Sequence, residues 1–147
     1  MTAAPHSLPC DLPQTRGAPV LLFDGVCVLC NGTARFVIAN DPDARIRLAT
    51  VQSPSGQAIL VALGMPTDRF DTFVFVEDGR AWFRSAAVFR MLAHLRRRWQ
   101  PLRLLSVLPT SWLDAGYDRI ARNRYRLFGK RDSCMIPAPD VAARFLP

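Results

Sequence analysis

The sequence predicts an α/β domain in which helices cover both faces of a small mixed sheet. In the first half of the chain, short apolar runs typical of buried strands alternate with segments of helical spacing. A hairpin pattern and two further helical segments follow them. Half of the 147 residues are hydrophobic and 21% are charged, so the chain can bury a core and does not have the composition of a disordered protein.

The first 17 residues are expected to form a flexible leader without regular structure, because three prolines and Gly17 interrupt any periodic pattern. Residues 18–147 are about one domain long, and we expect them to fold as a single unit that includes the C-terminal helix and tail. The leader lacks the basic and apolar parts of a secretory signal, and no apolar run approaches the ~20 residues of a membrane span. We therefore expect a cytoplasmic protein.

The first three elements should be two parallel strands joined by a crossover helix. The apolar run at residues 19–23 predicts a buried strand that ends at an Asp-Gly turn pair. Apolar residues at helical spacing predict a helix over residues 28–40, which an Asp-Pro step ends. A second strand is predicted at residues 46–50.

A second helix and a hairpin come next. Ser53 is a favourable N-cap with a proline after it, and the helical pattern continues from there to about residue 63. Two short runs, residues 72–76 and 80–84, enclose a glycine-containing turn. This is the clearest local pattern in the chain, and it predicts an antiparallel hairpin.

Two helices complete the predicted fold. Ser85 can cap a helix that runs to about residue 98, and a short apolar connector follows it. Ser111 and Asp114 have the spacing of a capping box for a last helix, with Gly129 as its C-terminal stop. The resulting order, βαβαββα with a helix appended at the C-terminus, is that of thioredoxin-like and glutaredoxin-like folds.

A pair of cysteines stands where the first strand passes into the first helix. A thiol at a helix N-terminus feels the positive end of the backbone dipole, so the pKa of Cys27 should fall below the free value of ~8.5. We expect Cys27 to be the more exposed thiol and the attacking thiolate. Cys30, on the same side of the first turn, would be the resolving thiol. A pair of buried, inert cysteines is the alternative interpretation.

Asp24 stands three residues before Cys27, at the end of the first strand. A partly buried carboxylate there could accept or relay a proton during thiol exchange. An Asx turn that leads into Gly25 is an equally good explanation from local chemistry. Both roles stay open at the level of the sequence.

Residues 23–31, Phe-Asp-Gly-Val-Cys-Val-Leu-Cys-Asn, resemble the signature of the DCC family of predicted thiol-disulfide oxidoreductases, named for its Asp and two Cys. The resemblance continues through residues 83–87 and 117–131. It implies a thioredoxin-like fold, the Asp and both cysteines as active-site residues, and a disulfide or thiol substrate. That substrate is either a protein or a low-molecular-weight thiol, and no bound cofactor is required.

Two features depart from typical thioredoxins. Asp71 and Thr72 precede the third strand where thioredoxins have a cis-proline, so substrate docking should differ. The Val-Leu pair between the cysteines matches neither thioredoxin nor glutaredoxin. The direction of the redox reaction therefore stays open.

Arg84 and Ser85 stand where a strand passes into a helix, and the N–H groups of such a turn can bind an anion. In glutaredoxins, which this topology resembles, the corresponding turn helps to hold a carboxylate of glutathione. By this analogy the two residues are candidates for substrate binding. An ordinary serine cap is the alternative.

Cys134 follows the last helix and is a candidate secondary thiol, which could resolve a disulfide or complete a metal site. A lone buried cysteine is the commoner outcome. Zinc requires about four ligands, usually in paired clusters, and Cys10, His6 and His94 are scattered. We therefore predict no metal site.

The chain carries 19 Lys and Arg against 12 Asp and Glu, a net charge of +7, with Lys130 as its one lysine. A non-catalytic binding module with an Arg-rich surface for an acidic protein, a nucleic acid or a membrane is thus the main alternative function. We expect no specific nucleic-acid binding, because no groove-entry motif or series of spaced aromatics accompanies the charge. Arginines and apolar residues at 95–105 leave weak peripheral membrane contact open. The basic residues near the C-terminus that could contact phosphates are Arg119, Arg122, Arg124, Arg126, Lys130 and Arg131.

The aromatic residues of the last helix are expected to pack inward. Trp112, Tyr117 and Tyr125 would anchor that helix to the core, as amphipathic helices commonly do.

Overall fold

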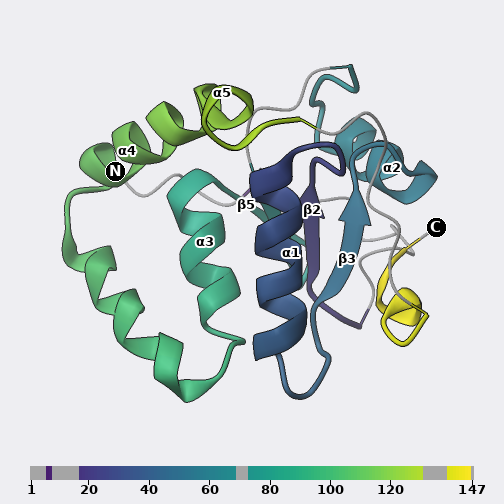
Figure 1. The fold of residues 1–147 in the computed structure, drawn as a ribbon, viewed down its shortest axis with the longest axis horizontal. Helices are drawn as coiled ribbons and strands as arrows, with labels where there is room; N and C mark the ends of the chain where they lie inside the picture. Colours follow the sequence, from purple (N-terminus) through teal and green to yellow (C-terminus); the bar gives the residue numbers. More distant parts are fainter. Residues whose placement is uncertain (1–5, 8–16, 69–72, 131–138, 147) are drawn as a thin grey trace.

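A mixed β-sheet forms the centre of the computed structural model, which describes residues 6–7, 17–68, 73–130 and 139–146 (Figure 1). Strand β2 (Val20–Phe23) pairs in parallel with β3 (Arg47–Thr50) and antiparallel with β4 (Val74–Glu77). Strand β4 pairs antiparallel with β5 (Arg80–Phe83), and β5 pairs antiparallel with β1 (His6–Ser7), so the strand order is β1-β5-β4-β2-β3.

The edge strand β1 lies within the N-terminal segment that we expected to have no regular structure. At His6–Ser7 that prediction is wrong, because these residues pair antiparallel with Ala81 and Arg80 of β5. Without β1, strand β5 would be the edge of the sheet, and its unpaired backbone groups can form hydrogen bonds with a further extended segment.

Helices lie on both faces of the sheet (Figure 1). Their bounds are Val28–Asn40 for α1, Pro54–Ala62 for α2, Arg84–Leu92 for α3, Thr110–Arg122 for α4 and Arg124–Phe128 for α5, with 3-10 helices η2 at Arg97–Val107 and η3 at Ala142–Arg144. The predicted α/β, thioredoxin-like fold is confirmed. No helix in the described part of the chain has the length and apolar composition to cross a bilayer.

The alternation of side chains along the strands divides the core into two layers. Leu21 and Phe23 of β2 point to the face that α1 and α3 cover. Val20 and Leu22 point to the opposite face, where Ile59 of α2 packs. Since both faces are covered, β2 is apolar throughout, as the sequence predicts.

Helix α3 begins and ends differently from the prediction. Phe83 is its N-cap and makes no side-chain capping bond, while Ser85 lies inside the helix, so the Ser85 cap is wrong. The helix stops at Leu92 rather than near residue 98, because the side-chain amide of Gln100 donates to the carbonyls of Leu92 at 2.9 Å and Leu95 at 2.8 Å. These side-chain bonds satisfy carbonyls that would otherwise continue the helix.

The predicted last helix is two helices. Helix α4 starts at Thr110 with Pro109 as its N-cap, so the capping box at Ser111 and Asp114 is wrong. At Asn123, with φ −104° and ψ 6°, the chain leaves α4 and enters α5. Gly129 ends α5 with φ +94°, a conformation that favours glycine, and this stop was predicted.

Candidate active site around Cys27 and Cys30

The two cysteines stand at the carboxyl end of β2, where α1 begins. Cys27 is the N-cap of α1, and its Sγ accepts the backbone N–H of Cys30 at 3.3 Å. The backbone N–H of Cys27 in turn donates to the carbonyl of Asp24 at 3.3 Å. Both thiols are free and buried. The predicted positions of Cys27 at the helix N-terminus and Cys30 in the first helical turn are therefore confirmed.

The expected order of exposure is wrong. Cys27 is 0% exposed and Cys30 is 7% exposed. The segment after α5 covers Cys27: Lys130 forms an antiparallel bridge with it, and the carbonyl of Gly129 accepts the N–H of Val28 at 3.3 Å. The bridge between Cys27 and Lys130 joins residues about 100 positions apart and leaves no signal in the local sequence. The sequence therefore predicts an exposed Cys27.

The two thiols differ in electrostatic environment. Burial raises the pKa of Cys30 above its ordinary value, and the hydrogen bond and charge of Cys27 raise it further, while the positive charge of Arg124 acts against them. At Cys27, the N–H of the helix end donates to the sulfur, which stabilises a thiolate there. A negative charge is therefore disfavoured on Cys30, and the hydrogen bond from the helix end is made to Cys27.

Asp24 is buried and accepts hydrogen bonds on both carboxylate oxygens. Its Oδ1 accepts the N–H of Val26 at 3.1 Å and the side-chain amide of Gln52 at 2.8 Å. Its Oδ2 accepts the hydroxyl of Tyr125 and a guanidinium N–H of Arg124 at 3.4 Å. These groups come from the end of β2, the loop before α2 and the start of α5.

The net effect of this network is to keep Asp24 ionised. Burial by itself raises the pKa of the carboxyl, but the hydrogen bonds from Tyr125, Gln52 and Val26 and the charge of Arg124 outweigh it and lower the pKa below 3.8. The bond from the N–H of Val26 is the predicted Asx turn, which is therefore confirmed. The proton-accepting role stays a prediction.

Arg124 and Tyr125 belong to the site, and the sequence did not indicate it. The sequence places Arg124 among the residues that could contact phosphates, yet it is buried with its guanidinium over the Tyr125 ring at 4.6 Å. Burial raises the pKa of Tyr125 to about 12, and its bond to Asp24 acts in the same direction. The available signal was their place in the third block of the DCC resemblance.

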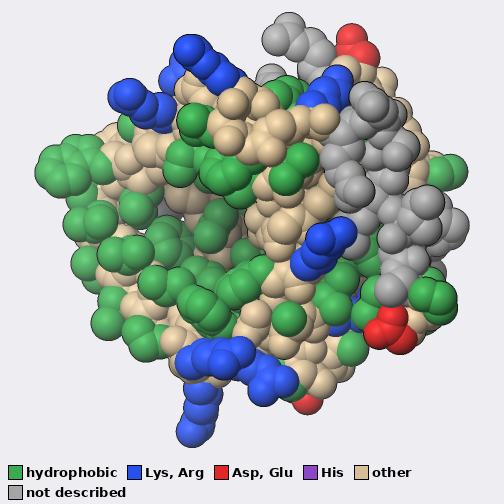
Figure 2. Space-filling view, in the orientation of Figure 1, with side chains coloured by type: hydrophobic (Ala, Val, Ile, Leu, Met, Phe, Trp, Pro, Cys, Tyr) green, Lys and Arg blue, Asp and Glu red, His purple; other side chains and the backbone are tan. Residues whose placement is uncertain are grey.

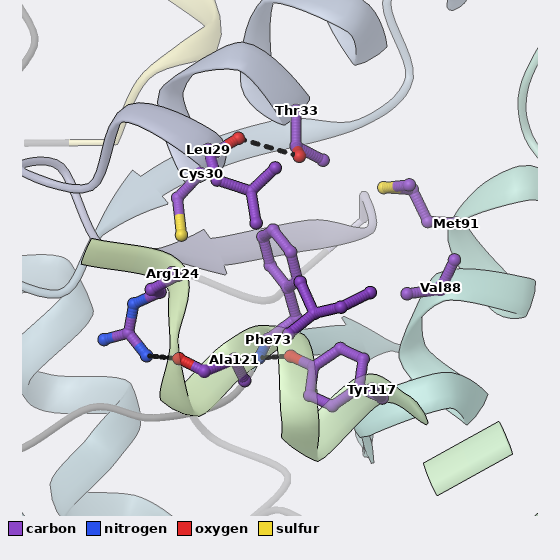
Figure 3. A pocket seen from close by; sticks show the side chains of 10 residues that line it. Leu29, Cys30, Thr33, Phe73, Val88, Met91, Tyr117, Ala121 and Arg124 are labelled. Carbon is purple, nitrogen blue, oxygen red and sulfur yellow. Dashed lines mark hydrogen bonds between the residues drawn. The ribbon is translucent and has the colours of Figure 1, made fainter. Parts of the chain in front are cut away.

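An apolar cavity of about 210 Å³ lies between α1, α3 and α4, and Cys30 lines it (Figure 3). Tyr117 also lines it, with its hydroxyl oxygen accepting the N–H of Phe73 at 2.6 Å. Tyr117 and Tyr125 thus each bond a distant segment, whereas Trp112 is largely exposed. The prediction that Trp112 anchors the helix to the core is wrong.

Arg84 and Ser85 bind acidic residues of α4. The Ser85 hydroxyl and its N–H donate to Oδ1 of Asp114, and Arg84 pairs with Asp118 at 2.9 Å. Carboxylates of this chain therefore already engage the start of α3. Substrate binding at Arg84 and Ser85 stays a prediction, and an anionic substrate would compete with Asp114 and Asp118 for these groups.

Cys134, the predicted secondary thiol, lies outside the described residues, as does Cys10. Within the described ranges, no group of three or more His, Cys, Asp or Glu side chains is placed to hold a metal ion.

Known proteins match the chain over most of its length. The family model of the DCC1-like thiol-disulfide oxidoreductases matches residues 21–130. The uncharacterised protein YuxK of Bacillus subtilis is 48% identical over 128 residues, which cover 87% of this chain and 93% of YuxK. A chloroplastic DCC family protein of Arabidopsis thaliana is 37% identical over 119 residues, 80% of this chain and 69% of that protein. No solved structure matches the chain significantly.

Proposed function

Because the chain belongs to the DCC1-like thiol-disulfide oxidoreductase family, we propose that it exchanges electrons with a thiol or disulfide substrate through Cys27 and Cys30. The observation that carries this proposal is the Cys27 sulfur at the start of α1, hydrogen-bonded to the N–H of the residue that bears the second thiol. In one direction the dithiol gives two electrons and two protons to a substrate disulfide, which leaves a Cys27–Cys30 disulfide and two substrate thiols. The other direction is the reverse.

Asp24 would serve as the proton acceptor of this exchange. Cys30 must lose its proton when the internal disulfide forms, and its pKa is raised by burial. Asp24 is ionised, and its charge acts on Cys30. A carboxylate in that position can take up the proton directly or through an intervening group.

A redox titration tests the proposed exchange. After mild oxidation, Cys27 and Cys30 should both resist alkylation in the unfolded protein, and dithiothreitol should release both, because residues three apart in a helical turn can be bridged. Peptide mass spectrometry locates the linkage, and Cys27→Ser and Cys30→Ser variants serve as controls. Two thiols that stay open to alkylation in the oxidised protein would rule out the exchange.

A second candidate function rests on the surface formed by η2 and the start of α4, here called the η2 face. Three of its apolar side chains are strongly exposed, namely Leu104 (70%), Val107 (83%) and Trp112 (70%). Figure 2 shows hydrophobic side chains gathered over this side of the molecule, with Lys and Arg side chains beside them. The arginines next to the η2 face that are exposed are Arg96, Arg97, Arg98 and Arg103.

The charge of this segment favours one class of partner. No acidic residue occurs in the sequence between Asp78 and Asp114. Apolar side chains flanked by arginine alone suit the boundary of a membrane that carries anionic lipids. We propose that the η2 face rests on such a membrane surface.

Co-sedimentation with lipid vesicles tests this contact. The protein should bind vesicles that contain phosphatidylglycerol more tightly than vesicles of phosphatidylcholine alone, and salt should weaken that binding. Leu104→Asp should abolish it, whereas Val61→Asp, at an exposed apolar position of α2, should not. Equal loss in both variants, or a self-association that Leu104→Asp disrupts without any vesicle binding, would contradict the proposal.

A further inference from the structure

The cavity beside Cys30 has a lining that the dithiol chemistry alone does not need. Apolar side chains from three helices and from Phe73 surround it, and almost all of its wall is carbon. Figure 3 shows Cys30 and Arg124 at one end of the cavity, with Val88 and Met91 at the other. The space of about 210 Å³ is enough for a small aromatic or branched aliphatic group.

Only one of the two thiols opens into this space. The cysteine in the lining is Cys30, while Cys27 is 0% exposed and lies beneath Gly129 and Lys130. A substrate that enters the cavity therefore meets Cys30 first. This geometry is the reverse of the order that the sequence suggested.

We propose that the cavity holds the apolar group of a thiol or disulfide substrate, and that the substrate sulfur becomes linked to Cys30. This inference rests on the proposed thiol-disulfide exchange and specifies its substrate class. Arg124 at the end of the cavity is already engaged by Asp24. The hydroxyls of Thr33 and Tyr117 form hydrogen bonds with the backbone, and the remaining apolar wall gives little compensation for burying the carboxylates of a thiol such as glutathione.

The exchange balances with the substrate as the only co-reactant. In the oxidised protein, a substrate thiolate attacks Sγ of Cys30, the Cys27–Cys30 bond breaks, and its electron pair goes to the sulfur of Cys27. The N–H at the start of α1 stabilises that thiolate, which makes Cys27 the better leaving group. A second substrate thiolate then attacks the substrate sulfur of the mixed disulfide, which releases the substrate disulfide and leaves Cys30 reduced. The reverse reaction passes through the same mixed disulfide.

Labelling with two methanethiosulfonates tests the inference. S-benzyl methanethiosulfonate transfers an apolar benzylthio group to a thiol with loss of methanesulfinate, and the 2-sulfonatoethyl reagent transfers a charged group in the same way. In Cys27→Ser protein, peptide mass spectrometry should locate the benzylthio group on Cys30. After each rate is divided by that for N-acetylcysteine, the benzyl reagent should be at least ~10-fold faster than the charged one.

A matched pair of variants on α4 shows whether the cavity causes this preference. Ala121→Phe places a ring in the cavity and should slow benzyl labelling of Cys30 at least ~10-fold. Ala115→Phe is exposed on the same helix and should leave the rate within about 2-fold. Should Ala121→Phe fail to fold, benzyl alcohol added to Cys27→Ser protein should still slow benzyl labelling of Cys30 by occupying the cavity.

Two results would overturn the inference. One is benzyl labelling of Cys27 in Cys30→Ser protein that is faster than labelling of Cys30 in Cys27→Ser protein. The other is the absence of any preference for the benzyl reagent. If either occurs while the wild-type protein still forms a reversible Cys27–Cys30 disulfide, the substrate class is wrong and the exchange stands. Selective labelling of Cys30 without that disulfide would instead refute the exchange.

Discussion

Asp24 holds a buried negative charge at the end of β2, and two of its donors, Arg124 and Tyr125, follow it by 100 and 101 residues. The carboxylate has a structural role through the N–H of Val26 and a proposed chemical role toward Cys30. Substitution by asparagine separates them, because asparagine keeps the shape and the acceptor oxygen but cannot take up a proton.

Asp24→Asn should therefore slow the oxidation of the dithiol to the Cys27–Cys30 disulfide, in which Cys30 loses its proton, by roughly 10-fold or more, if the carboxylate acts as the proton acceptor. Stopped-flow measurement of thiol release between pH 6 and about 8 checks the rate. Gln52→Ala, which removes a donor to the same carboxylate and leaves the carboxyl in place, is the control for general disturbance of the loop. Unchanged exchange rates in Asp24→Asn would show that the residue has a structural role in the Asx turn and no role in proton transfer.

The lowered pKa of Asp24 also predicts how stability depends on pH. The folded state binds the carboxyl proton of Asp24 less readily than the unfolded chain does. The stabilisation by the ionised carboxylate is therefore complete above pH 3.8 and is lost as the pH falls through the lower pKa of the folded state. The difference in unfolding free energy between wild type and Asp24→Asn should accordingly shrink below pH ~4. Urea unfolding at a series of pH values measures it, and a difference that stays constant from pH 7 to about 3 would contradict the lowered pKa.

At the scale of the elements, two residues of the first turn position α2 against the sheet: the N-cap Ser53 and Gly56. The Ser53 hydroxyl accepts the N–H of Gly56 at 3.1 Å, which is the predicted N-cap. Gly56 lies so close to β3 that a Cβ there would be 2.0 Å from the carbonyl oxygen of Thr50. The absence of a side chain thus allows α2 to approach the sheet.

Gly56→Ala and Gly32→Ala should change stability in opposite directions. Alanine at position 56 collides with backbone and should destabilise the protein by about 1–3 kcal/mol. Gly32 is in the first half of α1, where a Cβ would meet no atom within 4 Å, so alanine there should stabilise by about 0.5–1 kcal/mol. Denaturant midpoints measure both, and the same sign in the two variants would show that helix propensity, not contact with β3, decides the effect.

The elements also show what the sequence could predict. Helix α1 follows its predicted bounds, and the N-cap of α2 was found, because spacing and capping residues lie within a few positions of each other. The early end of α3 and the break at Asn123 were missed. Gln100 and Asp114 make side-chain contacts that compete with a continuing or capped helix, and the partner Ser85 of Asp114 is 29 residues away. Local periodicity carries no information on such contacts.

At the scale of the whole molecule, the net charge of +7 predicts weak association with any polyanion. Arg124, one of the residues that could contact phosphates, is buried in the site, while Arg119 and Arg126 remain exposed. Binding to a DNA duplex should be independent of sequence and should disappear between low salt and about 0.15 M salt, because counterion release supplies most of such affinity. Fluorescence anisotropy against salt concentration measures it. A selective complex at physiological salt would favour a nucleic-acid binding function.

The bridge between Cys27 and Lys130 joins the start of α1 to a segment that is synthesised much later. A ribosome extends the chain from its N-terminus at ~5–20 residues per second, so the dithiol emerges several seconds before Arg124, Tyr125 and Lys130 exist. During that interval Cys27 is uncovered, and Asp24 lacks the donors that α5 supplies. The nascent chain therefore exposes a thiol that the finished protein buries. Under oxidative stress, that thiol is open to oxidants before the native site has formed.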